Sequence, residues 1–244
     1  MADMANKKNH VLILQHFHEN PPGRVGDLLQ EHAIPYDTIH VGVDHLPDPA
    51  TYAAIVVLGG TQHLYDKHKY PYTVHEEIYL HSAIRQHIPY LGMCLGGQLL
   101  ANAFQAEVRR LPKERIGFLQ IHFTEAGTQD PLYQGLPGYQ QAFQWHEDCF
   151  ELPVGAVSLA HHEDSSNQAF RYLSHAYGLQ YHVELTEEML DTWLHSPSSK
   201  KEFIDAYGTG QYEKVEQEVA QLFPTYAHHA RILLENFFKI SKLM

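Results

Sequence analysis

Short apolar runs alternate with amphipathic stretches in the first part of the chain, and this alternation constrains the fold more than any other feature of the sequence. The runs His10–His16 (HVLILQH) and Ala53–Leu58 (AAIVVL) have the length and branched residues of buried strands, and Ile88–Met93 continues the series. Strands that alternate with helices form mostly parallel sheets with helices on both faces. The sequence therefore predicts an α/β fold in three layers around a mostly parallel sheet. The intervening stretches are the helical Arg24–Ala33, Thr73–His87 and Gly97–Gln105 and a further strand at Tyr36–Val41.

Past Glu107 the alternation gives way to a series of strand-like segments and then to helices. The strands are expected near Phe118–Thr124, Gln141–His146, Gly155–His161, Gln168–Leu173 and Gly178–Val183. The tail from Thr186 onward reads as several helices, with breaks expected near Pro197, Gly208–Gly210 and Pro224. Such a tail is too short for a second catalytic domain of ordinary size. We therefore predict one domain over residues 1–190 and a helical extension, residues 191–244, packed on the same domain.

The charge of the chain argues against one class of partner. Its 244 residues carry a formal net charge of −12 at pH 7 and include no basic stripe. A nucleic-acid binder needs a basic surface that releases counterions from the phosphates. We therefore expect no nucleic-acid partner.

The cysteines and apolar segments indicate a cytoplasmic protein. Cys94 and Cys149 are the two cysteines of the sequence, which are too few for a disulfide framework. Met1–Asn9 has no apolar core of a signal peptide, and no apolar run approaches the roughly 20 residues that cross a bilayer. We therefore expect a reducing, cytoplasmic location and no membrane association.

Histidine is unusually frequent in this sequence, with 20 residues. Several come in pairs or near pairs, namely His16 and His18, His161 and His162, and His228 and His229. No cluster of Cys or carboxylate residues completes a set of metal ligands around them. We therefore predict no metal site and interpret these residues as surface histidines that make the charge of the protein sensitive to pH.

The stretch around Cys94 has the pattern of a nucleophile at a strand-to-helix turn. Gly92-x-Cys94-x-Gly96 follows a predicted strand and opens a predicted helix. Glycines on both sides relieve the crowding of such a turn, which holds the nucleophile in a strained conformation. The helix N-terminus favours a thiolate, and the N–H of Leu95 would point at a developing oxyanion. We predict that Cys94 is a nucleophile; the alternative is a structural cysteine buried beside packing glycines.

His182 and Glu184 have the spacing of a base and of the residue that orients it. They lie at the end of the predicted strand Gly178–Val183, and residues i and i+2 of a strand point to the same face. The carboxylate can then fix the tautomer of the imidazole, as the third member of a catalytic triad does. For the pair taken alone, a strand end that faces solvent is the competing interpretation.

Together the two motifs resemble the signature of class I glutamine amidotransferases. G-x-C-x-G-x-Q around Cys94 is followed far downstream by G-x-Q-Y-H-x-E around His182. More narrowly, the chain is similar to stand-alone proteins that resemble the amidotransferase domain of GMP synthase. The likeness runs from about Val11 to Glu184 and implies a flavodoxin-like three-layer fold. Supporting segments are Gln15-His16, Pro22-Gly23, Leu58-Gly59-Gly60, Asp130-Pro131-Leu132, Trp145-His146-Glu147-Asp148 and Asn167–Arg171.

The resemblance implies a role for each matching position of the catalytic centre. Cys94 would be the nucleophile, His182 the acid and base, and Glu184 the orienting carboxylate. The backbone N–H groups of Gly60 and Leu95 would form the oxyanion hole.

The resemblance also implies two residues that contact the substrate. Gln98 would shape the glutamine pocket from the first turn of its helix. His146, in the H-x-D pattern of the family, would lie near the substrate or at the rim that faces an acceptor; the alternative is a satisfied buried histidine. The chain departs from the family pattern at Val183, where many members carry proline, and at Arg115, which interrupts a Glu-Ile-Gly run.

The implied reaction is cleavage of a γ-glutamyl amide through a thioester, with release of glutamate and of ammonia or an amine. This half-reaction needs no metal or organic cofactor. The chain has no phosphate-binding glycine loop and no attached synthetase. Either a separate synthetase subunit takes the ammonia, or the enzyme is a hydrolase, such as a γ-glutamyl peptidase that acts on glutathione-like peptides.

Two further alternatives are weaker. A cysteine peptidase of the same broad fold would carry histidine directly after its cysteine, where this chain has Leu95. A catalytically silent binding or regulatory module is the alternative that is not an enzyme, and the presence of all three triad residues argues against it.

Overall fold

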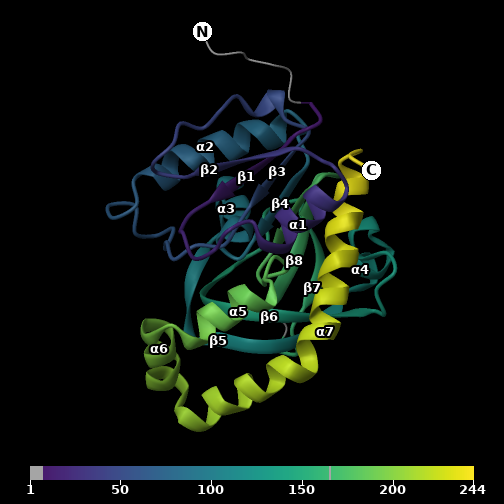
Figure 1. Cartoon of the computed structure of the whole chain (residues 1–244). Helices are drawn as coiled ribbons and strands as arrows, with labels where there is room; N and C mark the ends of the chain where they lie inside the picture. The colour runs from purple at the N-terminus through teal and green to yellow at the C-terminus, as the bar shows by residue number, and fades with distance from the viewer. Residues whose placement is uncertain (1–7, 165) are drawn as a thin grey trace.

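A mixed sheet of nine strands forms the centre of the part of the chain that the structure describes (Figure 1). The structure is a computed structural model that describes residues 8–164 and 166–244, so the expectation for Met1–Asn9 lies largely outside the described residues. The strands, in their order across the sheet, are β2 (Tyr36–His40), β1 (Val11–Gln15), β3 (Ala54–Val57), β4 (Tyr90–Met93), β9 (Ala176–Leu179), β8 (Asn167–Tyr172), β7 (Val157–His161), β5 (Val108–Phe123) and β6 (Tyr139–Phe150).

The sheet has a parallel half and an antiparallel half. Strands β2, β1, β3, β4 and β9 pair in parallel. From β9 onward, each pair (β9 with β8, β8 with β7, β7 with β5, and β5 with β6) is antiparallel. Short loops suffice between consecutive antiparallel strands, whereas the parallel strands need helical crossovers. The change of sequence pattern past Glu107 therefore marks where the topology changes, and the α/β prediction is confirmed.

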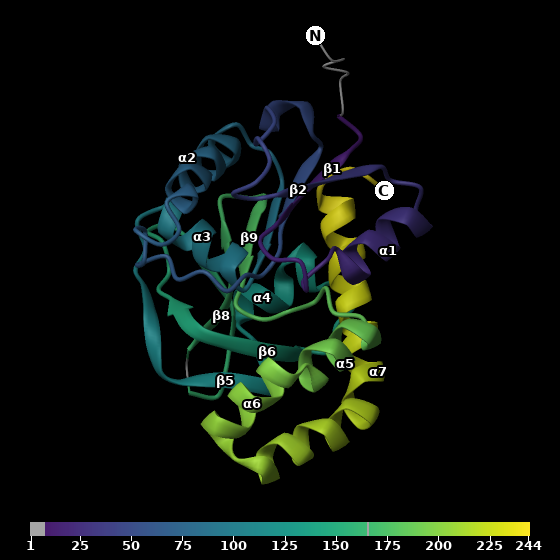
Figure 2. The same ribbon diagram turned by 60° about the vertical axis from the view of Figure 1, so that its left-hand side comes forward.

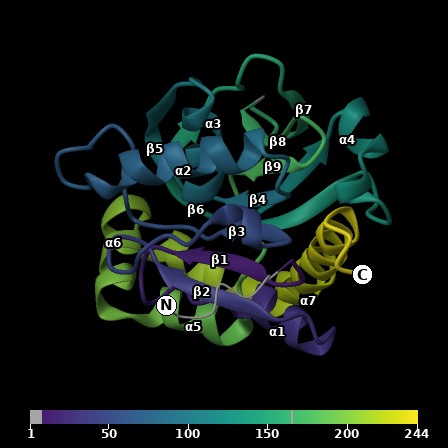
Figure 3. The same ribbon diagram turned by 90° about the horizontal axis from the view of Figure 1, so that it is seen from above.

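Helices cover both faces of the sheet, which gives the expected three layers (Figure 3). Leu12 and Leu14 point to the face covered by α2 and α3, whereas Val11 and Ile13 belong to the core on the face covered by α1 and α7. Among the described residues, no helix is both long and apolar enough to cross a membrane. The helices are α1 (Gly23–Glu31), α2 (Tyr72–Arg85), α3 (Leu95–Ala103), α4 (Glu125–Gln129), α5 (Glu187–His195), α6 (Pro197–Tyr207) and α7 (Thr209–Ile240), with 3-10 turns at Pro49–Thr51 and Pro131–Tyr133.

The C-terminal helical region is interrupted at two of the three places that the sequence predicts. Pro197 begins α6 and Gly208, with a φ of 82°, separates α6 from α7. The expected break at Pro224 is wrong, because α7 runs through this residue from Thr209 to Ile240. Figure 1 shows that α7 is bent, as a helix with an internal proline is. Burial of the helix in the core overrides the local cost of the proline.

Two of the paired histidines are not at the surface. His16 is buried, and its Nε2 lies 3.0 Å from each carboxylate oxygen of Glu76, which is buried as well. His229 is buried, and its Nδ1 accepts a hydrogen bond of 3.0 Å from the backbone N–H of Gln141. The prediction of surface histidines is wrong for these two, because a partnered imidazole can be buried at little cost.

Helix α7 is tied to the chain that leaves β9 by one buried hydrogen bond. The hydroxyl of Tyr226 accepts from the backbone N–H of Leu185 at 3.0 Å, and both side chains are fully buried. A buried N–H that loses its acceptor carries the full cost of its desolvation. This bond therefore links the C-terminal helix to the segment that carries His182 and Glu184.

We predict that Tyr226→Phe lowers the free energy of unfolding by about 1–3 kcal/mol, because the N–H of Leu185 loses its acceptor. Tyr36→Phe is the matched control, since the Tyr36 hydroxyl accepts only an exposed hydrogen bond from Gln30. Urea denaturation followed by circular dichroism would measure both variants. Equal stabilities of the two variants would show that the buried bond contributes little.

Candidate functional site

Cys94 occupies a strained turn between β4 and α3. The strand ends at Met93, the helix begins at Leu95, and Cys94 has a φ of 51° and a ψ of −107°. This left-handed conformation is costly for a residue with a side chain. A methyl group on Gly96 would overlap the carbonyl oxygen of Val57, so the helix approaches β3 as closely as it does only because this position is glycine. The turn predicted from the sequence is present.

His182 reaches Cys94 because β9 lies beside β4. The two strands run in parallel with Met93 opposite Leu179, so the chain leaves both at the same edge of the sheet. Ligand sites of open α/β sheets lie at this carboxyl edge. The strand itself is shorter than predicted, since β9 ends at Leu179. The N–H of His182 then donates to the carbonyl of Phe143 at 3.0 Å, which fixes the backbone of the histidine.

His182 and Glu184 form a buried pair. The His182 Nδ1 lies 2.7 Å from an oxygen of Glu184, and neither side chain is more than 3% exposed. The other carboxylate oxygen accepts a hydrogen bond of 2.9 Å from the N–H of Val183. Asn20, which follows β1, donates its amide to Glu184 at 3.3 Å. Sequence reasoning missed Asn20, because no local pattern connects it with a residue 164 positions away.

The electrostatics of this pair favour an imidazolium beside a carboxylate. Burial alone would lower the pKa of His182, but the charge of Glu184 and the interaction with Cys94 outweigh it and raise the pKa to about 10. Burial would raise the pKa of Glu184, and the charge and hydrogen bond of His182 lower it below its ordinary value. The Nε2 of His182 has no hydrogen-bond partner among the described residues. It is therefore free to exchange a proton with a reacting group.

The side chains of Cys94 and His182 converge on Gly59. A methyl group added at Gly59 would lie 2.8 Å from Cε1 of His182 and 3.5 Å from Cβ of Cys94. The next residue, Gly60, lines the pocket. Within the described residues, neither the N–H of Gly60 nor that of Leu95 donates a hydrogen bond. Two unpaired N–H groups close to a nucleophile are the donors that an oxyanion hole requires.

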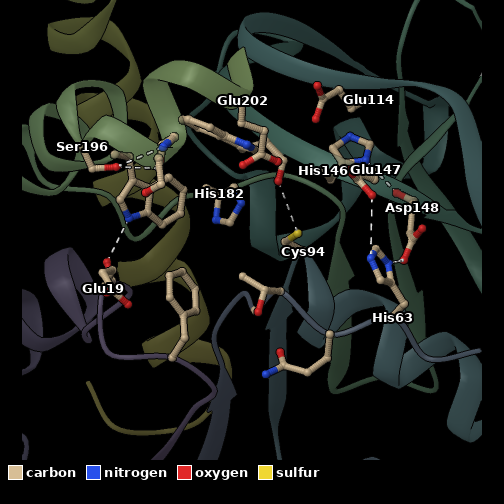
Figure 4. Close-up of a pocket in the computed structure, with 18 of the residues that line it drawn as sticks. Glu19, His63, Cys94, Glu114, His146, Glu147, Asp148, His182, Ser196 and Glu202 are labelled. Atoms are coloured by element: carbon tan, nitrogen blue, oxygen red, sulfur yellow. Dashed lines mark hydrogen bonds and ion pairs between the residues drawn. The ribbon is translucent and has the colours of Figure 1, made fainter. Parts of the chain in front are cut away.

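Cys94 opens into a pocket of about 430 Å³ (Figure 4). His182 lies on one side of Cys94, and His146, Asp148 and His63 lie on the other. The predicted residues Gly60, Cys94, Gln98, His146 and His182 all line this pocket. Of the other two, Glu184 pairs with His182 and Leu95 directly follows Cys94.

The C-terminal helices supply walls of the pocket that sequence reasoning missed. Figures 1 and 2 place α5 and α6 beside β5 and β6. The ring of Trp193 packs edge-on against the imidazole of His182, with 5.1 Å between the ring centres. The Nε1 of Trp193 donates a hydrogen bond of 2.9 Å to the carbonyl oxygen of Glu19. Further lining residues from these helices, and from Ser196 between them, are Thr192, Ser198, Ser199 and Glu202.

Gln98 and His146 share one acceptor on β6. The Gln98 amide donates to the carbonyl oxygen of Asp148 at 3.3 Å, and the His146 Nδ1 donates to the same oxygen at 2.7 Å. Burial lowers the pKa of His146 to about 3, which keeps the imidazole neutral. Its Nε2 is therefore an acceptor, and it is buried without a hydrogen-bond partner in the described chain.

Comparison with known proteins gives consistent matches. A family model described as glutamine amidotransferase class-I matches residues 29–195. The chain is 30% identical over 187 residues to the glutamine amidotransferase-like protein YfeJ of Salmonella typhimurium, a match that covers 72% of this chain and 74% of that protein. It is 32% identical over 155 residues to the glutamine-hydrolyzing GMP synthase of Thermosipho africanus, which covers 63% of this chain and 27% of that enzyme.

The fold matches a solved structure along nearly its whole length. The crystal structure of a glutamine amidotransferase from Thermotoga maritima superposes with a TM-score of 0.81 at 26% identity. The match covers 96% of this chain and 98% of the other. It confirms the predicted fold class and includes the long C-terminal helix.

We predict that Cys94 reacts with iodoacetamide much faster than Cys149 at neutral pH. The two side chains are almost equally buried, at 5% and 7% exposed, so exposure alone would not separate them. Cys94 lines the pocket, whereas burial raises the pKa of the Cys149 thiol against the opposing charge of Arg109. Peptide mapping after limited alkylation measures the two rates. Preferential labelling of Cys149 would contradict the nucleophile assignment.

We also predict that the stability of the protein falls as the pH rises from about 6.5 to about 10, because His182 binds its proton more tightly in the folded state. The stabilisation is complete below the pKa of an unfolded histidine and is lost as the pH passes through that of His182. Urea denaturation at a series of pH values measures the free energy of unfolding. This free energy should fall less steeply with pH for Glu184→Gln, which lacks the charge that raises the pKa of His182. If the free energies of the wild type and of Glu184→Gln fall with pH in parallel, the buried ion pair is excluded.

Proposed function

The chain belongs to the class I glutamine amidotransferase family, and from this membership we propose that it cleaves a γ-glutamyl amide through a thioester on Cys94. One observation carries the proposal. The side chain of His182, held by Glu184 at 2.7 Å, converges with Cys94 at the floor of a pocket of about 430 Å³. A nucleophile and a base in one cavity, with a carboxylate that orients the base, are the parts that acyl transfer requires.

The proposed reaction begins with attack of the Cys94 thiolate on the side-chain amide carbon of the substrate. The carbonyl oxygen becomes an oxyanion that the N–H groups of Gly60 and Leu95 would bind, with about 3–4 kcal/mol of stabilisation per donor. His182 gives its Nε2 proton to the leaving nitrogen, and the carbon–nitrogen bond breaks to leave the thioester. A water molecule then gives a proton to His182 and attacks the thioester, and the carbon–sulfur bond breaks to release glutamate and regenerate the Cys94 thiolate beside protonated His182.

Residues 191–244 belong to the same functional unit as residues 1–190 in this proposal. The support is that Trp193 and Ser196 line the pocket and that Tyr226 holds the chain next to Glu184. We assign the protein to the cytoplasm, because Cys94 and Cys149 are both free thiols and the reaction needs the first of them reduced.

A second candidate is service to a separate synthetase subunit that would take up the ammonia. The similarity to glutamine-hydrolyzing GMP synthases favours it. The two candidates differ in what the chain does alone. A glutaminase that serves a partner often has low activity until the partner binds, because ammonia released without an acceptor is wasted. A stand-alone hydrolase needs no such inhibition.

We predict that the purified chain hydrolyses at least one γ-glutamyl compound without ATP, metal or partner. Glutamine, glutathione and simple γ-glutamyl amides should be compared, with glutamate release as the measurement. Rapid turnover of one compound supports the hydrolase, whether amidase or peptidase. Negligible turnover of all of them with Cys94 still open to alkylation would favour the synthetase partner. A Cys94 that is also inert to glutamine-like electrophiles would favour a silent binding module.

Triad variants provide the control for this experiment. Glu184→Gln should lower kcat by about 10⁴-fold because the amide favours the wrong imidazole tautomer. His182→Ala should cost at least as much. Full activity of Glu184→Gln with an unchanged circular dichroism spectrum would exclude the proposed triad.

A further inference from the structure

Three glutamates from separate elements gather at one side of the pocket. Glu114 comes from β5, Glu147 from β6 and Glu202 from α6, and all three line the cavity that contains Cys94. One carboxylate oxygen of each lies within 4.8 Å of one from each of the others. Figure 4 shows Glu114 and Glu202 on the side of the pocket away from His63. We call these three residues the acidic wall.

A bulge in β5 brings Glu114 into the wall. Arg110 pairs with Asp148 and Arg115 pairs with His146, so residues 111–114 lie opposite the single residue Glu147. Extra residues on one strand bend it and redirect its side chains. Arg115, the departure from the family pattern, is held away from the wall by Asp164 and by the hydroxyl of Ser166 at 2.7 Å.

The acidic wall has more negative charge than the neighbouring cations neutralise. Arg110 pairs with Glu147 at 2.7 Å, and the Nε2 of His63 lies 3.7 Å from the same carboxylate. No ion pair of Glu114 or Glu202 is found among the described residues, and Lys113 lies over the ring of Tyr207 at 4.1 Å. Burial and the charges of the two other glutamates outweigh the charges of Arg110 and Lys113 and raise the pKa of Glu114. One oxygen of Glu114 is buried without a hydrogen-bond partner.

His146 adds an independent indication that a hydrogen-bond donor is missing from this pocket. This side chain is 4% exposed, is kept neutral, and lines the same pocket. Its Nδ1 donates to Asp148, which leaves the unpartnered Nε2 as an acceptor. An ammonium group offers donors alone, so it can bind an imidazole nitrogen and carboxylates at once.

We propose that the acidic wall binds a positively charged amine on the leaving side of the substrate, which makes γ-glutamyl amides of diamines the preferred substrates. This inference rests on the proposed γ-glutamyl hydrolysis. We assign the acidic wall to the leaving amine because Glu202 lies outside the part of the chain that matches the family model. That match ends at residue 195, and Glu202 lies on α6. The glutamyl part is common to all substrates of the proposed reaction, whereas the leaving amine is the part that can vary.

The test compares three γ-glutamyl amides of equal length on the full chain. The leaving amines are diaminobutane, which is cationic, pentylamine, which is neutral, and 4-aminobutyrate, which is anionic. We expect kcat/KM for the cationic amide to exceed that for the neutral one by about tenfold, the size of one charge-assisted hydrogen bond, with the anionic amide the poorest. Glu202→Gln should bring this ratio towards one, and Glu213→Gln, at an exposed position on α7 outside the pocket, should leave it unchanged.

Binding to Cys94→Ala, measured by calorimetry, separates this inference from the proposed reaction. If the cationic amide binds more tightly than the neutral one and this difference depends on Glu202, the amine-binding site is supported. If the wild type also fails to hydrolyse these amides, the proposed hydrolase activity is rejected while the amine-binding site stands. Equal binding of the cationic and neutral amides would overturn the inference. So would an equal loss for both amides in Glu202→Gln, since the wall would then hold the α-ammonium of the glutamyl group. Tight Mg²⁺ or Mn²⁺ binding that Glu202→Gln abolishes, without charge-selective amide binding, would overturn it in favour of a metal site.

Discussion

Cys94 and His182 are far apart in the sequence and meet because β4 and β9 pair in parallel. With Met93 opposite Leu179, the chain leaves both strands at one edge of the sheet and within reach of one cavity. Two other site segments leave strands at this edge: Gly60 follows β3, and Asn20 follows β1. A shift of β9 by one residue would turn its side chains to the other face of the sheet and would separate His182 from Cys94.

The buried His182–Glu184 pair carries an energetic cost. Two charges that leave water lose several kcal/mol of solvation each, and their attraction compensates only when further hydrogen bonds satisfy the ions. Asn20 and the N–H of Val183 supply these bonds to the carboxylate. The Nε2 of His182 has no hydrogen-bond partner among the described residues. The surroundings therefore satisfy the carboxylate of the pair and leave one nitrogen of the imidazole without a partner.

Local patterns predicted the parts of the site that one segment determines. The turn at Cys94 depends on neighbouring glycines, and the His182–Glu184 contact depends on a spacing of two residues, so both were visible in the sequence. Residues brought in by tertiary contacts were not, and Asn20 and the acidic wall are the examples. The predicted break at Pro224 was wrong for the same reason, since burial of α7 outweighed the local preference of proline.

The C-terminal helices connect the stability of the site with the shape of its pocket. Tyr226 on α7 holds the N–H of Leu185, next to Glu184, while Trp193 on α5 packs edge-on against His182. The following helix, α6, carries Glu202 into the same cavity. Residues that pack around His182 and Glu184 and residues that line the pocket thus lie on one continuous helical segment. A change in this segment that alters the pocket would also disturb the packing around His182, so the shape of the pocket and the position of this imidazole depend on the same helices.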